Sequence, residues 1–285
     1  MTMKQKTIIA IAALCMAVAS VFADAKSDAL IEAAKSNNTA EVARLIADGV
    51  NVNARDNYSN TVLMWAAGSN AADAIKMLIE AGADVNAKKY SYWTALMEAA
   101  YSNATDAAKV LIEAGADVNA QDDDGKTALM YAIMENATDT VKVLIEADAD
   151  VNAKFYFRYT ALMWAAMGNA ADVARVLIEA GADVDAKTDA GQTVLMSAAH
   201  SNAADVAKVL IEAGADVDAK TDAGWTALMS AAHSNTADVA KVLIEAGADV
   251  HAKADDGRTA LMIAATHKAT DVAKLLIAAG AETEE

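Results

Sequence analysis

Seven threonines recur along this chain at a constant interval of 33 residues, and this period restricts the fold more than any other feature of the sequence. They are Thr61, Thr94, Thr127, Thr160, Thr193, Thr226 and Thr259. The clearest unit, residues 221–253, reads TDAGWTALMSAAHSNTADVAKVLIEAGADVHAK, and the unit before it differs at only four positions. A period this regular indicates a stacked array of short units, not a compact globule.

The residues of one unit predict two short helices and a turn. Thr226 is a good helix cap, and an apolar stretch rich in alanine follows it. Asn235 is predicted to cap a second, amphipathic helix, and Gly247 to end that helix in the left-handed conformation. Neither helix is long enough to be stable alone in water, so each unit must bury its apolar faces against its neighbours.

These motifs carry a family resemblance. The 33-residue period, the run T-A-L-M-x-A-A, the run V-L-I-E-A-G-A-D-V-N-A and the Asp/Gly turn resemble the ankyrin repeat over essentially all of residues 24–285. The resemblance implies a mainly α fold: a solenoid of antiparallel helix pairs linked by outward-pointing β-hairpin loops, with about eight repeats. The chain departs from the family in one respect, because Ala or Val, Leu and Met follow each threonine where the family usually has Pro-Leu-His.

The repeats also suggest domain boundaries. We expect residues 24–56 to form an irregular N-terminal capping repeat, residues 57–253 to form six internal repeats, and residues 254–285 to form a C-terminal repeat. Residues 1–23 have the features of a signal peptide of bacterial type. Lys4 and Lys6 precede an uncharged, mostly apolar run that ends near Ala19, and Val-Phe-Ala then offers a cleavage site after Ala23.

The N-terminal segment therefore predicts an exported protein, periplasmic or extracellular. Cleavage after Ala19 is the competing choice, and a short buried helix or a membrane anchor is the alternative for the whole segment. The run is short for a membrane span. Lipidation of Cys15, the only cysteine, is disfavoured because Leu14 precedes it where lipoproteins have a small residue.

The charge of the chain limits its partners. With 23 basic and 40 acidic residues the formal charge is −17. Such a surface repels nucleic acid, whose binding depends on Lys and Arg at phosphates, and it repels anionic lipid. We expect no nucleic-acid partner and no membrane contact of the mature form.

Motifs for chemistry are incomplete. Gly125-Lys126-Thr127 lacks the earlier glycine of a phosphate-binding loop, and Asp122 to Gly125 lacks the further ligands of a calcium loop. His200 and His233 occupy equivalent places in adjacent units, which is too distant for one zinc ion, and His251 and His267 complete no cluster. The methionine in each unit is expected to fill the core. The sequence thus predicts a non-enzyme with no catalytic residues, no metal site and no cofactor.

The aromatic residues point to function because they depart from the repeat. Twelve of the fourteen lie between Tyr58 and Trp164. One set falls in the predicted turns: Tyr58, Tyr90, Tyr92, Trp93, Phe155, Tyr156, Phe157 and Tyr159. The other falls on the first helix of successive units: Trp65, Tyr101, Tyr131 and Trp164.

In the ankyrin family these two locations line the concave face and the loop tips, where partners usually bind. The resemblance therefore implies that both sets bind a partner together with Glu98, which shares the helix row of Trp65, Tyr131 and Trp164. Ser59, Tyr92 and Arg158 replace the turn glycine of other units, and Asp123 and Asp124 form an acidic tip between two aromatic tips. We expect Arg158, Asp123 and Asp124 to bind the partner as well. We expect the rings around Phe155–Tyr159 to be exposed, since exposed Tyr and Trp usually mark interaction sites.

The sequence therefore predicts a monomeric protein-binding module or scaffold whose partner presents basic and apolar side chains. A glycan-binding protein that uses the same rings is one alternative. An accessory protein that shields an exported enzyme is the other. Rings that merely stiffen the hairpins would give the same pattern in the sequence.

Overall fold

The computed structural model describes residues 25–282. The predicted signal peptide, residues 1–23, lies outside the described residues. The chain divides into two compact units between Asp122 and Asp123, called unit 1 and unit 2 below. No helix in the described part of the chain is long and apolar enough to cross a membrane.

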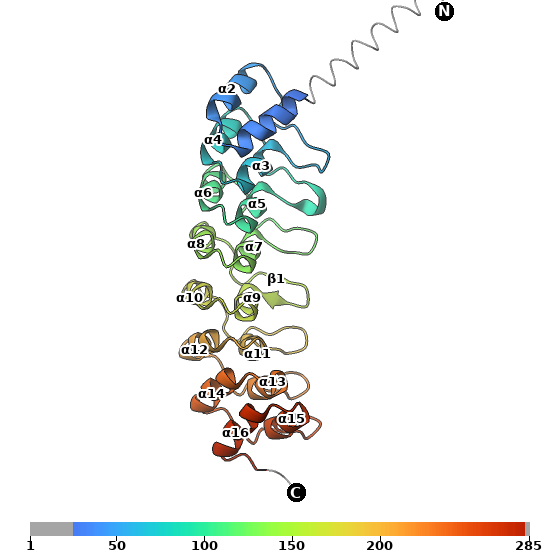
Figure 1. Ribbon diagram of the computed structural model, residues 1–285, viewed down its shortest axis with the longest axis vertical. Coiled ribbons are helices and arrows are strands. Elements are labelled where there is room, and N and C mark those ends of the chain that lie inside the picture. Colours follow the sequence, from blue (N-terminus) through green and yellow to red (C-terminus); the bar gives the residue numbers. More distant parts are fainter. Residues whose placement is uncertain (1–24, 283–285) are drawn as a thin grey trace, which may run out of the picture. The chain divides into compact units, whose positions relative to one another are not determined.

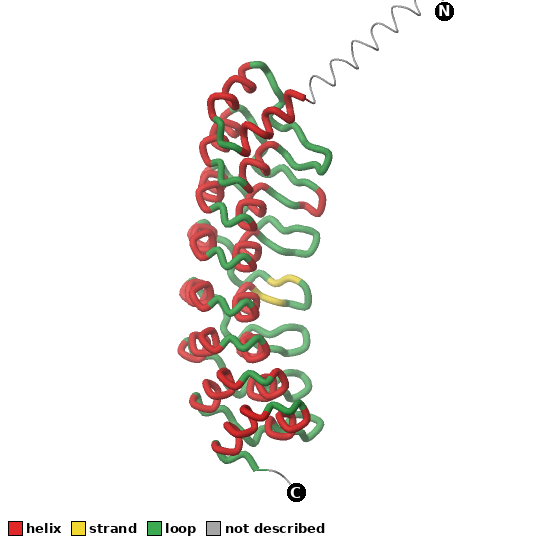
Figure 2. The backbone as a smooth tube through the Cα atoms, viewed as in Figure 1, coloured by secondary structure: helices red, strands yellow, loops and turns green. Residues whose placement is uncertain are grey.

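Both units are stacks of short helix pairs joined by hairpin loops, as Figures 1 and 2 show. Unit 1 begins with a helix over residues 25–35. Its further elements are α2 Thr39–Ala47, α3 Val62–Gly68, α4 Ala72–Glu80, the 3₁₀ turn η1 Tyr90–Tyr92, α5 Ala95–Tyr101 and α6 Thr105–Glu113. Helix α3 packs on α5, and α4 packs on both α2 and α6. First helices thus stack on first helices, and second helices on second helices.

Unit 2 repeats this arrangement. Its elements are α7 Ala128–Met134, α8 Thr138–Glu146, β1 Lys154–Phe155, β2 Tyr159–Thr160, α9 Ala161–Met167, α10 Ala171–Glu179, α11 Val194–His200, α12 Ala204–Glu212, α13 Ala227–Ser234, α14 Ala237–Glu245, α15 Ala260–Thr266 and α16 Thr270–Ala278. The first helices α7, α9, α11, α13 and α15 contact one another in order, and so do the second helices. This architecture confirms the predicted fold class.

The repeat threonines cap the first helices as the sequence predicts. In Thr226, for example, the side-chain oxygen accepts a hydrogen bond from the Met229 N–H at 3.3 Å. Thr127 is an exception, since its hydroxyl oxygen is buried and has no hydrogen-bond partner among the described residues. The prediction for Asn235 is wrong: it has φ 56° and ends α13 in the left-handed conformation, and Thr236 precedes α14. Asparagine tolerates this conformation better than most residues, which explains its recurrence there.

The core consists of small and flexible side chains. Most alanines on the first helices are almost fully buried. So are the methionines that follow the repeat threonines by three residues, namely Met64, Met97, Met130, Met163, Met196 and Met229, whereas Met262 of the last repeat is half-buried. The methionines therefore fill the space between helices, as predicted. Gly247 has φ 88° and ends α14, as the sequence also predicts.

Side chains in the loops that follow the second helices join successive repeats. The side-chain oxygen of Asn53 accepts from the Asp84 N–H at 2.8 Å, and its amide donates to the Gly82 carbonyl at 3.1 Å. Asn86 and Asn152 make the same two bonds to the repeats that follow them. Asp185 and Asp218 occupy the same position in later repeats. Their carboxylates accept a hydrogen bond from the backbone N–H of the next repeat but donate none to the glycine carbonyl.

Candidate partner-binding surface

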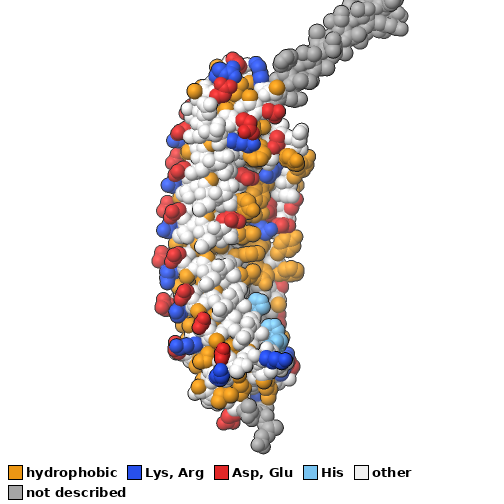
Figure 3. All heavy atoms as spheres, in the orientation of Figure 1, with side chains coloured by type: hydrophobic (Ala, Val, Ile, Leu, Met, Phe, Trp, Pro, Cys, Tyr) orange, Lys and Arg blue, Asp and Glu red, His pale blue; other side chains and the backbone are white. Residues whose placement is uncertain are grey.

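The hairpin tips carry the most exposed aromatic rings of the described residues. In unit 1 the exposed fractions are 75% for Tyr58, 72% for Tyr90 and 60% for Tyr92. In unit 2 they are 57% for Tyr156 and 70% for Phe157. These five rings are called the tip rings below. On the face drawn in Figure 3, hydrophobic side chains gather on the side of the hairpins.

Several tip residues adopt a backbone conformation that normally requires glycine. Tyr92, Phe157 and Arg158 have φ values of 57°, 51° and 62°. Glycine occupies the place of Tyr92 and Arg158 in the following hairpins, for example Gly191 with φ 72°. A side chain in the left-handed region is disfavoured by roughly 1 kcal/mol. The hairpins around Tyr92 and Phe157 thus hold large side chains at strained positions.

The acidic tip lies at the start of unit 2. Asp123 is exposed, whereas Asp124 is held by the chain itself. The Tyr156 hydroxyl donates to Asp124 Oδ1 at 3.0 Å, and Lys126 Nζ lies 3.0 Å from Oδ2. The bond from Lys126, followed by that from Tyr156, lowers the pKa of Asp124. The acidic tip and one aromatic tip are therefore connected within unit 2.

Trp65 is tied into unit 1. Its indole Nε1 donates to Asp56 Oδ2 at 2.9 Å, and Lys35 Nζ lies 3.9 Å from the centre of its ring. Burial alone would raise the pKa of Asp56, but hydrogen bonds from Asn60, Trp65 and the Tyr58 N–H together lower it. Asp56 thus stays ionised and fixes the indole by a charge-assisted bond.

Trp93 and Glu98 form a second group in unit 1. The indole Nε1 of Trp93 donates to Glu98 Oε2 at 2.8 Å, and Lys89 Nζ lies 3.2 Å from the same oxygen. The Tyr101 ring packs edge-on against Trp93, with centres 6.1 Å apart. Tyr101 is 49% exposed, whereas Trp93 and Glu98 are more deeply buried. This group presents a rigid surface of one phenol ring and the edge of one indole.

The expectation of exposure is wrong for Phe155. Its side chain is 7% exposed and packs against Met130, Ala153 and Trp164, with the rings of Phe155 and Trp164 stacked at 5.9 Å. The cause is the alternation of a strand: on β1, Lys154 points outward and Phe155 therefore points inward. Tyr159 borders the same cluster, and the buried indole Nε1 of Trp164 has no acceptor among the described residues.

Tyr131 is also buried, at 7% exposed, which contradicts its predicted place on an open surface. It lies on the hairpin side of α7, where Lys126 Nζ covers its ring at 5.9 Å from the centre. Of the predicted helix row, Trp65 and Glu98 belong to unit 1, and Tyr131 and Trp164 to unit 2. The structure brings Trp164 to Phe155 and Glu98 to Trp93.

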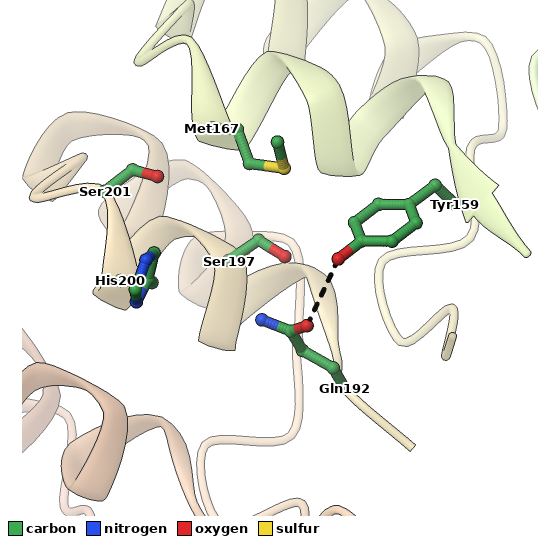
Figure 4. A pocket seen from close by; sticks show the side chains of 6 residues that line it. All are labelled: Tyr159, Met167, Gln192, Ser197, His200 and Ser201. Atoms are coloured by element: carbon green, nitrogen blue, oxygen red, sulfur yellow. Dashed lines mark hydrogen bonds between the residues drawn. The ribbon is translucent and has the colours of Figure 1, made fainter. Parts of the chain in front are cut away.

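A pocket of about 370 Å³ adjoins the last aromatic hairpin (Figure 4). Tyr159 and Met167 line one side of the pocket, and Ser197, His200 and Ser201 line the other. The hollow exists because Ser197 is a small residue at the helix position where Trp164 lies one repeat earlier. The Tyr159 hydroxyl lies 3.5 Å from Oε1 of Gln192, the sixth lining residue.

The histidines of unit 2 are closer together than the sequence suggested. His233 Nδ1 lies 3.1 Å from His267 Nε2, and His200 Nδ1 lies 2.9 Å from the Ser234 hydroxyl. His267, which the sequence places in no cluster, therefore forms a pair with His233. Both contacts join residues 34 apart in the chain, one more than the repeat period, so a comparison of equivalent positions misses them.

No group of three or more His, Cys, Asp or Glu among residues 25–282 could hold a metal ion. The prediction that the chain is not an enzyme fits a family that is generally non-enzymatic.

Comparisons with known proteins agree with this architecture. The family described as ankyrin repeats (3 copies) matches residues 9–89, 87–155, 151–221 and 214–285. The human ASB11 ankyrin repeat domain has a similar structure, with a TM-score of 0.71 and 26% identity, over 79% of this chain and all of that one. No curated protein matches the chain. Since the family covers most of the sequence, the chain belongs to the ankyrin-repeat family.

Proposed function

We propose that the chain is a non-catalytic protein-binding module that recognises its partner through the tip rings. Ankyrin repeats generally mediate protein–protein interaction, so the class of function follows from the family. The observation that carries the finer proposal is the placement of the tip rings, which lie at exposed tips of a chain with few aromatic residues.

The exposure of the rings alone does not distinguish a binding site from a stiffened loop. The exposure together with the backbone conformation does distinguish them. Rings that stiffen a hairpin pack on it, as Phe155 does at 7% exposed. Phe157 instead remains 70% exposed at a left-handed position, and Tyr92 at such a position is 60% exposed. The fold gains little burial from either side chain, so contact with a partner is the better explanation. Large rigid rings bind with little loss of side-chain entropy.

The partner we propose is a protein with basic and apolar side chains. Asp123 is exposed, and the whole chain has a formal charge of −17, so cationic side chains are attracted to it. Their aliphatic parts and charges both suit tyrosine and phenylalanine rings. From residues 1–23 we further propose that this recognition takes place after export, outside the cytoplasm.

The chain itself supplies the experiment. The next two hairpins after Phe157 carry the tip Asp-Ala-Gly, for example Asp189-Ala190-Gly191. The triple change Tyr156→Asp, Phe157→Ala and Arg158→Gly installs that tip in the aromatic hairpin. A second variant does the same in unit 1, with Tyr90→Asp, Ser91→Ala and Tyr92→Gly.

Partners captured from extracts of the native host are identified by cross-linking and mass spectrometry, and affinity is then measured with the purified partner. We expect each variant to weaken binding at least tenfold, because central aromatic contacts dominate interface energies. Urea midpoints should stay equal or rise, since glycine relieves the left-handed strain. The matched control is Ala190→Ser with Ala223→Ser, which alters two tips that lack rings.

The proposal fails if both variants bind the partner as tightly as the unaltered chain. It also fails if the variants retain affinity per folded molecule while their urea midpoints fall, since the rings are then structural. Ring-dependent binding of purified oligosaccharides, with no protein partner, would instead favour the glycan-binding alternative.

A further inference from the structure

We propose that His233 and His267 form a binding site for one divalent transition-metal cation of the Zn²⁺, Ni²⁺ or Cu²⁺ type. His233 lies in the last turn of α13 and His267 directly follows α15, so the site joins the last two repeats of unit 2. The site lies outside the tip rings and does not depend on their function.

The two rings have the geometry of a pair of ligands. Two imidazole nitrogens bound to one cation at about 2.0–2.1 Å lie roughly 3 Å apart when the angle between the bonds is near 100°. The observed distance from His233 Nδ1 to His267 Nε2 is 3.1 Å. The ring centres are 4.2 Å apart, and the ring planes are inclined at 63° to each other. In the free chain these nitrogens share a hydrogen bond, so one of them carries a proton. When a cation binds, that imidazole would move its proton to its other ring nitrogen and the rings would rotate, so that both nitrogens present a lone pair to the cation.

Both histidines are held at the ends of helices. The His233 ring packs edge-on against Trp225, with ring centres 5.8 Å apart. The N–H of His267 donates to the Ile263 carbonyl at 3.0 Å as it ends α15. A preformed pair loses little entropy on binding, and this favours chelation over single-histidine binding.

The pair is accessible from solvent. Both side chains are exposed, so a hydrated cation can approach. Arg258 would repel a cation, but its charge is paired with Asp256 at 2.6 Å.

The donor set selects the class of cation. Imidazole suits zinc, nickel and copper, whereas magnesium and calcium prefer oxygen ligands. Water would complete the coordination, because no third protein ligand joins the pair in the described part of the chain. The site should therefore bind more weakly than structural zinc sites with four protein ligands.

The test uses the full chain without a polyhistidine tag. Titration calorimetry with ZnCl₂ and NiCl₂ measures affinity, with MgCl₂ as the control cation. The variants are His233→Ala, His267→Ala and His267→Gln. The matched control is His251→Ala, since His251 is exposed on a loop of the same unit.

We expect one cation per chain, and at least tenfold weaker binding when either His233 or His267 is replaced. His251→Ala should bind like the unaltered chain. The electron paramagnetic resonance spectrum with one equivalent of Cu²⁺ should show two coupled nitrogens, and one in each single variant. His267→Gln keeps hydrogen-bonding capacity, so it decides the question if the alanine variants melt early. Equal affinity in all variants, or a copper spectrum without two nitrogens from this pair, would overturn the proposal.

Discussion

Replacing Asp185 and Asp218 with asparagine should stabilise unit 2, and the chain contains the comparison that shows why. Both residues occupy a place where four earlier repeats have asparagine. Three of these asparagines donate their amide to the carbonyl of the glycine that ends the next second helix, at 3.1 Å in each case: Asn53 to Gly82, Asn86 to Gly115 and Asn152 to Gly181.

The carboxylates keep only half of this connection. Asp185 accepts from the Asp216 N–H at 2.9 Å, and Asp218 accepts from the Asp249 N–H at 2.8 Å. Ionised aspartate has no hydrogen to donate, so the carbonyls of Gly214 and Gly247 gain no bond from it. Each carboxylate also contributes to the excess negative charge of a chain with 40 acidic residues.

The magnitude follows from the bond gained. A net hydrogen bond contributes about 0.5–1.5 kcal/mol, and an exposed one belongs near the lower end. We therefore expect about 0.5–1 kcal/mol for each substitution and about 1–2 kcal/mol for both. An unfolding entropy of about 2.1 cal/mol/K per residue makes this a rise of roughly 2–4 °C in the melting temperature of the double variant.

Thermal and urea unfolding, followed by circular dichroism at pH 7, measure the effect. The reverse change, Asn152→Asp in the same unit, is the control and should lower the midpoint by a similar amount. The reasoning is refuted if Asp185→Asn and Asp218→Asn leave the midpoint unchanged while Asn152→Asp also has no effect. The second helices would then be held without this bond.

Three further stability predictions rest on contrasts between equivalent positions, each measured by urea unfolding. Asp148 has φ 62° where other second helices end in glycine, so Asp148→Gly should raise the midpoint by up to about 1 kcal/mol, and a lower midpoint would show that its side chain contributes more than the strain removes. Trp65→Phe should lower the free energy of unfolding by about 1.5–3 kcal/mol because it removes the donor to ionised Asp56. Trp164→Phe should leave the free energy of unfolding nearly unchanged because that indole has no acceptor among the described residues. Equal losses in the two variants would contradict this reasoning. Thr226→Val should cost about 1 kcal/mol through the lost helix cap, whereas Thr127→Val should be neutral or stabilising because the Thr127 hydroxyl is buried without a described partner, and the reverse order would refute the argument.

The sequence predicted well those structural features that recur at the same position in every repeat. The threonine caps, the buried methionines and the left-handed glycines are local signals, and each is repeated at the same place in the stack. The prediction that Asn235 caps the start of a helix was wrong because asparagine is common both at helix starts and at left-handed helix ends. Only the backbone geometry separates these two uses.

The features that the sequence could not predict depend on the direction of a side chain. Phe155 and Tyr156 are adjacent aromatic residues, yet one is buried and the other is exposed. The alternation of the two-residue strand β1 decides this, and the other hairpins do not form named strands in the described residues. His233 and His267 meet by a diagonal contact between repeats, so a search at an interval of 34 as well as 33 would have found them.

A departure from the repeat is therefore not by itself a sign of function, because the fold absorbs some departures. Phe155 stands where unit 1 has the charged residues Asp56, Lys89 and Asp122, and it fills its place by stacking on Trp164. Phe157 and Tyr92 differ from Phe155 because they hold left-handed backbone positions and remain mostly exposed. A residue that destabilises the free chain and gains little burial needs a reason outside the chain. The combination of a strained backbone and an exposed ring thus selects the positions at which a partner should be sought.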